Sequence, residues 1–207
     1  TKRANFGEMR KSRSLTGKIS SMNNTVKLYG SDQFGLICGY VFNAVSGSRV
    51  ISSEQAVDWL HQEKELTNDD FIWLHFNLAH TASEKWLARH LDLSDVFYEA
   101  LHEGVRSTRI EYVDDTLIAV INDVLFDFSF ETSDVATLWL SVNERVVISA
   151  RAKPLRSIDH LRAAVKEGEN FTSPVDLLVH LLRDQADVLT QIVRDVAYKV
   201  DHVEDRL

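Results

Sequence analysis

The C-terminal stretch SPVDLLVHLLRDQADVLTQIVRDVAYKVDHVEDRL, residues 173–207, predicts one long helix. Ser173 suits the N-cap, Pro174 the first helical position, and Asp176 the first turn, where a negative charge suits the helix dipole. No Gly or Pro follows, and at about 1.5 Å per residue the helix would extend roughly 50 Å. The apolar spacing is still running at Leu207, so we expect the helix to continue beyond it.

The apolar residues of this helix recur in alternating steps of four and three, which is a heptad seam. The seam consists of Leu182, Ala186, Leu189, Val193, Val196, Val200, Val203 and Leu207. Such a seam is typical of helices that pack along their length, and its β-branched residues favour more than two helices. The alternative for the first half is a helix lying on its own sheet. Beyond Val193 the helix should extend past the domain, which favours packing between copies.

Upstream of this helix, strand and helix patterns alternate. The strand-like runs are FGLICGYVFNA (34–44), DFIWLHFNL (70–78), TRIEYVD (108–114), TLIAVINDVLFDF (116–128), VATLWLSV (135–142) and RVVISAR (145–151). The helix-like runs are 52–66, 81–91, 94–104 and 153–168. The first two start with residues at capping-box spacing, Ser52 with Gln55 and Thr81 with Glu84. Run 70–78 is apolar on both faces, so both sides of the sheet should be covered.

These runs predict the α/β class: an α/β/α sandwich with a mixed, largely antiparallel sheet, followed by a long C-terminal stalk helix. The short turns between the last four strand-like runs account for the antiparallel pairs. We expect three segments: a basic, disordered tail (1–33), the α/β/α domain (34–172), and the stalk helix (173–207).

Charge is unevenly distributed along the chain. The net charge is −8, yet residues 1–30 contain seven Lys or Arg and one acid, leaving −14 on the rest. An acidic body repels nucleic acid and concentrates cations, so no nucleic-acid partner is expected. The apolar runs are much shorter than the roughly 20 residues that cross a bilayer. A single cysteine, Cys38, and no secretory signal indicate a reducing cytoplasm.

The chain has no motif of a known catalytic class, so no enzymatic activity and no organic cofactor are expected. Cys38 lies in an apolar run and is interpreted as inert core. His75 is interpreted as a sheet residue. His180 and Asp184 share one helix face, as do His202 and Asp205, but two ligands are too few for a tight zinc site. The candidate metal ligands from the helix are His180, Asp184, Asp201, His202 and Asp205.

Several motifs, taken in their order along the chain, resemble the cytoplasmic domain of the CorA divalent-cation transporters. They are FIWLHFN, then VFYEALHEGVRSTRIEYVDDTLIAVIND, LWLSVNERVVISARAKPLRSIDHLR and the final helix, and they cover Phe34–Leu207. The VVISAR run and the Trp139 strand resemble the zinc-transport branch, ZntB. Magnesium members carry an acidic pair at a regulatory metal site on the third helix. Here Glu99, a further candidate ligand, is followed by Ala100.

The resemblance implies a pentamer whose domains form a cytoplasmic funnel, with the helix running on into the first of two transmembrane segments. This chain would then be the soluble part, at the cytoplasmic face of the inner membrane. Zinc would be the transported ion, with other divalent cations possible. Three alternatives stay open: a magnesium or cobalt channel domain with a regulatory metal site, a free-standing cytosolic module that oligomerises through the helix, and a hydrolase with an unrecognised site.

Overall fold

The structure is a computed structural model that describes residues 30–62, 70–103, 108–125 and 134–204. Contacts divide the chain into residues 1–30 and 31–207, and the fold below is that of the second unit. The basic segment 1–29, Gly104 and Leu207 therefore lie outside the described residues, as does the side chain of Val203.

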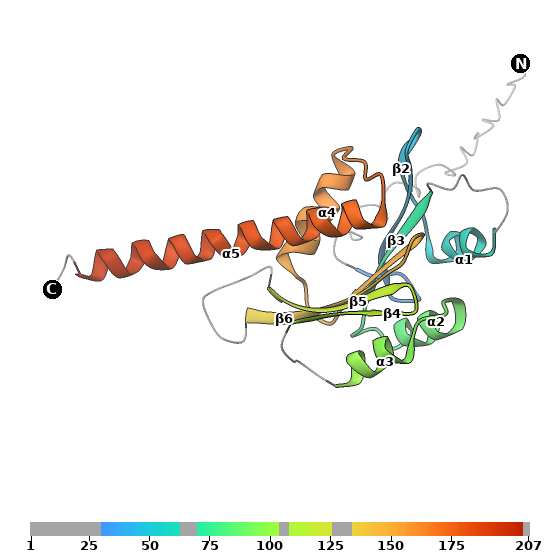
Figure 1. Cartoon of the computed structure of the whole chain (residues 1–207), viewed down its shortest axis with the longest axis horizontal. Coiled ribbons are helices and arrows are strands. Elements are labelled where there is room, and N and C mark those ends of the chain that lie inside the picture. Colours follow the sequence, from blue (N-terminus) through green and yellow to red (C-terminus); the bar gives the residue numbers. More distant parts are fainter. Residues whose placement is uncertain (1–29, 63–69, 104–107, 126–133, 205–207) are drawn as a thin grey trace, which may run out of the picture. The chain divides into compact units, whose positions relative to one another are not determined.

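The described residues form strands and helices in the order that the sequence predicts, with one additional strand (Figure 1). The strands are β1 (Leu36–Asn43), β2 (Gly47–Val50), β3 (Phe71–Asn77), β4 (Arg109–Val113), β5 (Thr116–Val124), β6 (Val135–Val142) and β7 (Val146–Arg151). The helices are α1 (Ser53–His61), α2 (Ser83–His90), α3 (Asp95–His102), α4 (Arg156–Lys166) and α5 (Pro174–Glu204).

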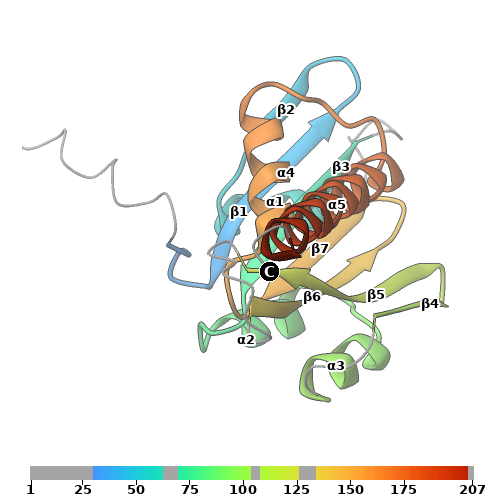
Figure 2. The same ribbon diagram turned by 90° about the vertical axis from the view of Figure 1, so that its left-hand side faces the viewer.

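The seven strands form one sheet in the order β2-β1-β3-β7-β6-β5-β4. Strands β3 and β7 pair in parallel, and each of the other neighbouring pairs is antiparallel. Helices α1, α2 and α3 lie on one face, and α4 and α5 on the other (Figures 1 and 2). The predicted α/β/α sandwich with a mixed, largely antiparallel sheet and a long final helix is confirmed.

Strand β3 is buried on both faces, as predicted. Phe71 and Trp73 belong to the core beneath α4 and α5, whereas Ile72, Leu74 and Phe76 belong to the core beneath α1, α2 and α3. Side chains alternate between the faces of a strand, so this run supplies apolar residues to both layers.

Strand β2 was not predicted. It pairs with the end of β1 after a tight turn at Gly47, whose φ is +81°. Its residues Arg49 and Val50 are exposed at the sheet edge, so the sequence there lacks the apolar alternation that indicates a strand.

The helix starts show both a correct and a wrong prediction. Ser52 and Gln55 form the reciprocal capping box of α1, as expected. The box predicted at Thr81 and Glu84 is wrong, because α2 begins at Ser83 and has no side-chain cap. The Ser83 hydroxyl instead donates to the Asn77 carbonyl at 2.5 Å, which ties α2 to the end of β3.

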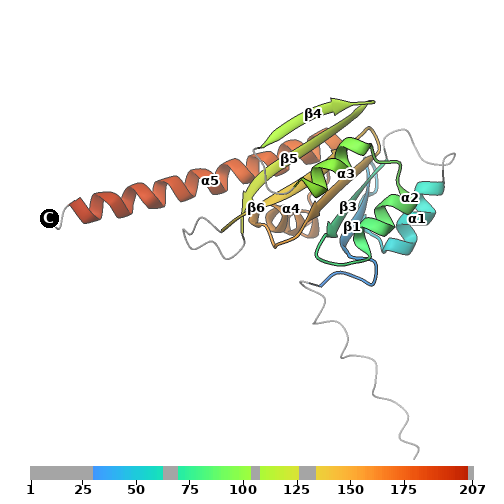
Figure 3. The same ribbon diagram turned by 90° about the horizontal axis from the view of Figure 1, so that it is seen from below.

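Helix α5 begins as predicted and runs for 31 residues. The Ser173 hydroxyl accepts a hydrogen bond from the Asp176 amide at 3.1 Å, and the Asp176 carboxylate accepts one from the Thr172 amide. Its first half lies over the sheet and its second half projects past the sheet (Figures 1 and 3). No helix among the described residues combines the length and apolar character that crossing a membrane requires.

Candidate functional site

The two halves of α5 have different environments. In the first half Leu177, Leu178 and Leu181 are buried in the core above the sheet, and Val188 is the last buried residue among the described side chains of the helix. The interpretation of this half as a helix on its own sheet is therefore correct. Beyond Val188 no described residue of α5 is fully buried.

The second half exposes the predicted seam. Leu189 is 44% exposed, Val193 67%, Val196 42% and Val200 51%. Complete burial of one such side chain contributes about 1.5–3 kcal/mol, so a stripe of four is a substantial apolar surface open to association. We call these four residues the α5 stripe. It continues the line of Val175 and Val179 at the start of the helix, which are also exposed.

Helices α4 and α5 enclose a cleft of about 400 Å³, which we call the α4–α5 groove. It is lined by Arg156, His160, Asp184, Asp187, Val188 and Gln191. The groove thus combines two carboxylates and an imidazole with one fixed positive charge.

One turn of α5 before Asp184, His180 lies between two carboxylates. Its Nδ1 is 3.2 Å from Oε1 of Glu169, which follows α4, and its Nε2 is 3.4 Å from Oδ2 of Asp184. The ring of Phe171 packs edge-on against the imidazole, with centroids 5.1 Å apart. Burial raises the pKa of the Asp184 carboxyl, and the charges of His180 and His160 oppose this rise only in part.

The other predicted ligands are not brought together. Asp201 and His202 are exposed, about 26 Å along the helix from Asp184 at 1.5 Å per residue. The His202 ring stacks on Tyr198. Glu99 is exposed on α3, on the opposite face of the sheet, and Asp205 lies outside the described residues. In the described part of the chain, no three His, Cys, Asp or Glu side chains are arranged to hold a metal ion.

The sequence reasoning missed two groups near His180 and Asp184. Glu169 and His160 lie outside helix α5, and only the packing of α4 against α5 brings them close. Helical spacing could therefore find the His180 and Asp184 pair but not these neighbours.

A buried polar cluster lies beneath α4. The Trp73 indole donates to the Ser149 hydroxyl at 2.8 Å, and His75 Nδ1 lies 2.8 Å from the same oxygen. Burial lowers the pKa of His75 well below its usual value, so the ring is neutral at pH 7. His75 is a buried sheet residue, as predicted, although its Nε2 has no partner among the described residues.

Cys38 is predicted to be unreactive in the folded chain. Burial raises the pKa of its thiol from 9.0 to about 11, against the lowering effect of Arg162, Lys166 and Arg151. The thiolate fraction near pH 8 is then about 100-fold smaller, and the thiolate is the nucleophile. We expect Ellman's reagent to modify the folded chain at pH 8 about 100-fold more slowly than the urea-unfolded chain. Rates within a factor of three of each other would contradict this.

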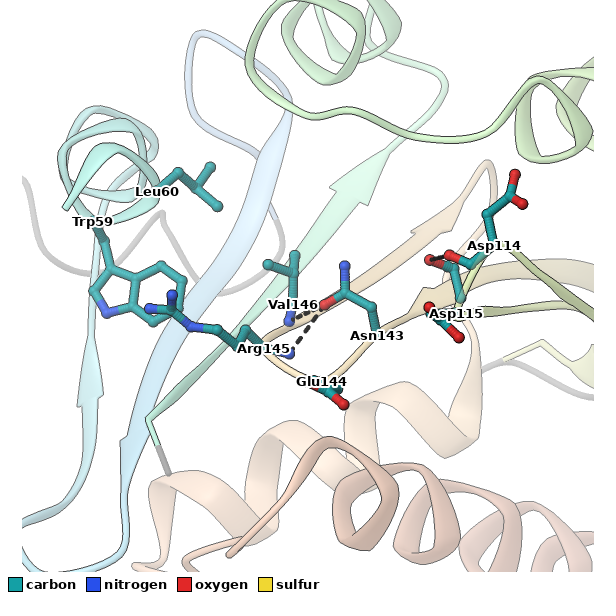
Figure 4. A pocket seen from close by; sticks show the side chains of 9 residues that line it. Trp59, Leu60, Asp114, Asp115, Asn143, Glu144, Arg145 and Val146 are labelled. Carbon is teal, nitrogen blue, oxygen red and sulfur yellow. Dashed lines mark hydrogen bonds between the residues drawn. The ribbon is translucent and has the colours of Figure 1, made fainter. Parts of the chain in front are cut away.

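A second cleft, of about 560 Å³, lies at the turns between β4 and β5 and between β6 and β7 (Figure 4). Arg145 extends over the Trp59 ring, 5.2 Å from its centroid, with Asp114 and Asp115 on the other side. Both aspartates have positive φ, as a two-residue hairpin turn requires. Asn143 accepts from the amides of Arg145 and Val146 and so shapes the other turn. The polar groups of this cleft thus serve the turns.

The sequence matches a known family over most of the described domain. The profile of the CorA-like Mg²⁺ transporter protein family matches residues 68–207. The chain belongs to this family. The CorA-like family consists of transporters and not of enzymes, which agrees with the lack of catalytic motifs.

Curated relatives are divalent-cation transporters. The divalent cation transporter CmaX of Pseudomonas aeruginosa is 26% identical over 178 residues, which cover 84% of this chain and 51% of CmaX. The zinc transport protein ZntB of Klebsiella pneumoniae is 22% identical over 175 residues, which cover 80% of this chain and 54% of that protein. The CorA-like chain therefore spans about half the length of these relatives.

Solved structures share the fold. The full-length CmaX structure matches with a TM-score of 0.75 at 24% identity, covering 86% of this chain and 53% of that one. The cytoplasmic domain of ZntB from Vibrio parahaemolyticus matches with a TM-score of 0.64 at 14% identity, covering 81% of this chain and 64% of that one. At these identities the likeness establishes the α/β/α domain with its long final helix.

Proposed function

We propose that this chain is the cytoplasmic domain of a homo-oligomeric transporter that moves divalent cations across the inner membrane. The observation that carries the proposal is the α5 stripe, a row of exposed apolar residues on a helix that projects from a CorA-like domain. A stripe at heptad spacing gains free energy when copies of the helix pack together. The helix would then form a stalk that transmits movement of the domains to a pore.

Five copies around one axis are the assembly that we propose, with the α/β/α domains forming a funnel. The β-branched stripe supports more than two helices. Asp187, Asp195 and Asp201 are exposed on the same helix. Repeated around an axis, these carboxylates would attract cations toward the pore.

Zinc is the proposed ion. The ZntB relatives are zinc transport proteins, which supports zinc. CmaX is described as a divalent cation transporter and the family profile as an Mg²⁺ transporter, so magnesium is the alternative. Glu99 is exposed and is followed by buried Ala100 in place of a second acid, which favours zinc over an Mg²⁺-gated channel.

Self-association through the α5 stripe is tested by the double variant Val193→Asp with Val196→Asp. Placing two charges in the stripe removes apolar area and adds repulsion between copies, so association of the 207-residue chain should weaken at least tenfold. Sedimentation velocity over a range of concentrations measures the association.

The matched control is Val45→Asp with Val50→Asp. These valines are 96% and 71% exposed but lie in the β1–β2 hairpin, away from α5. The control should associate like the unmodified chain. An unmodified chain that stays monomeric at several hundred micromolar, or a control that weakens equally, would overturn the role of the stripe.

The ion is tested with the transporter that contains this domain, reconstituted in liposomes. Uptake of Zn²⁺ should exceed uptake of Mg²⁺ at equal concentrations. Uptake of Mg²⁺ alone would show that the zinc proposal is wrong and leave the family assignment intact.

A further inference from the structure

His180 lies next to Asp184, a residue of the α4–α5 groove, but the two side chains are separated by more than an ordinary hydrogen-bond distance. Within α5, His180 Nε2 and Asp184 Oδ2 are 3.4 Å apart, and Asp184 Oδ2 is a buried atom without a hydrogen-bond partner in the described residues. This separation is longer than the roughly 2.7–3.2 Å that is usual for an N–H···O hydrogen bond. Two ligands that share a metal ion stand at about this separation, because bonds of about 2.0–2.2 Å in a tetrahedron give an edge of about 3.4 Å.

The other nitrogen of His180 has the partner that a metal-bound histidine needs. Its Nδ1 faces the Glu169 carboxylate at 3.2 Å, and Phe171 packs against the ring. A carboxylate that accepts the distal N–H fixes the tautomer, turns Nε2 toward the metal and increases its basicity. Glu169 is therefore placed as the residue that orients His180.

A third ligand is available across the groove. His160 of α4 lines the same cleft as Asp184. As they stand, His160, His180 and Asp184 do not together enclose an ion, but His160 is exposed, so its ring can rotate without unpacking the core. Asp187 also lines the cleft, and with Asp184 it outweighs the single charge of Arg156 there.

We propose that His180 and Asp184 form a divalent transition-metal site, which His160 completes from α4 and Glu169 orients. Two imidazoles and a carboxylate suit Zn²⁺, whereas Mg²⁺ takes oxygen ligands and retains its waters. The site lies within one chain and does not rest on the proposed transport function. A bound ion would join α4 to the first half of α5, the part of the helix that precedes the α5 stripe.

Titration of the 207-residue chain with Zn²⁺ at pH 7.5, by calorimetry in the presence of excess Mg²⁺, tests the proposal. The unmodified chain should bind one ion at this site. His180→Gln and Asp184→Asn should each weaken binding at least tenfold, and Glu169→Gln should weaken it by about tenfold or more, as loss of an orienting group does.

The matched control is His102→Gln. His102 Nε2 lies 3.3 Å from Glu84 Oε2, which is nearly the same pairing, but both side chains are largely exposed and lie outside the groove. This variant should bind Zn²⁺ like the unmodified chain. Equal binding by the His180→Gln chain, or equal weakening by the control, would overturn the site.

The coordination itself is tested by X-ray absorption and with Co²⁺. The zinc spectrum of the unmodified chain should fit two imidazoles, and the Co²⁺ form should show the intense visible absorption of a tetrahedral ion. A spectrum with one imidazole would remove His160 from the site, and an octahedral, all-oxygen spectrum would overturn the proposal. Circular dichroism of each variant verifies that its fold is retained.

Discussion

Replacing Trp73 by alanine is expected to lower the free energy of unfolding by about 3–5 kcal/mol. Trp73 is fully buried in β3 and stacks on Tyr40, with ring centroids 5.7 Å apart. Its indole donates to the Ser149 hydroxyl at 2.8 Å. The substitution would leave a large cavity under α4 and α5 and also remove this hydrogen bond. Because domains are stable by only about 5–15 kcal/mol, the loss should bring the chain close to unfolding.

Urea unfolding followed by far-UV circular dichroism measures the effect. Tyr198→Ala is the control, since Tyr198 is 71% exposed on α5. That change should alter stability by less than about 0.5 kcal/mol. An unfolding midpoint for the Trp73 variant close to that of the unmodified chain, with the same slope, would show that β3 is not central to the core.

Replacing Asp123 by alanine is expected to cost about 2–4 kcal/mol. Asp123 is buried in β5 and accepts hydrogen bonds from the amides of Val124, at 2.8 Å, and Ser157, at 3.3 Å, and from the Ser157 hydroxyl. Leu155, at the N-cap of α4, offers no side-chain cap, so Asp123 caps this helix from a strand. Its loss would leave buried donors unpaired and weaken the attachment of α4, and with it the α4–α5 groove.

The Asp123→Asn variant tests the charge of this group. Burial raises the pKa of Asp123 above 3.8, and the hydrogen bonds from Ser157 and Val124 oppose the rise. The Asp123 carboxyl therefore binds its proton more tightly in the folded chain than in the unfolded chain. The contribution of Asp123 to stability is therefore greatest at low pH and declines as the pH rises from 3.8 through the raised pKa.

Unfolding of both chains across this pH range measures the contribution. The stability of the unmodified chain relative to Asp123→Asn should fall as the pH rises, because the amide cannot ionise. A relative stability that rises with pH would mean that hydrogen bonding to the carboxylate outweighs its burial.

Local signals in the sequence predicted local structure well when no distant segment competed. The Ser52 and Gln55 box and the Ser173 cap act within four residues, and both formed. The spacing at Thr81 and Glu84 is the same, yet no box formed there. The Ser83 hydroxyl donates to the Asn77 carbonyl at the end of β3, and the N-cap of α2 is Ala82, one residue later than predicted.

In the candidate metal site, too, local spacing predicted one part and only tertiary packing supplied the other. The spacing of His180 and Asp184 predicted that they share one face of a helix, and they do. His160 lies on the exposed side of α4 and Glu169 follows that helix, and no periodicity relates them to α5. The same criterion pairs His202 with Asp205, but His202 is exposed on the projecting half of α5, and Asp205 lies outside the described residues.

By itself, the sequence determined the succession of strands and helices, the start of α5, its apolar seam and the acidic character of the body. These features follow from residue type, from the two-residue period of a strand, and from the three- to four-residue period of a helix. Only the tertiary structure decided that β3 pairs in parallel with β7, that Asp123 caps α4, and that α5 leaves the buried core after Val188. Each of these depends on segments far apart in the chain whose contacts form together in one packed core, so no local pattern specifies them.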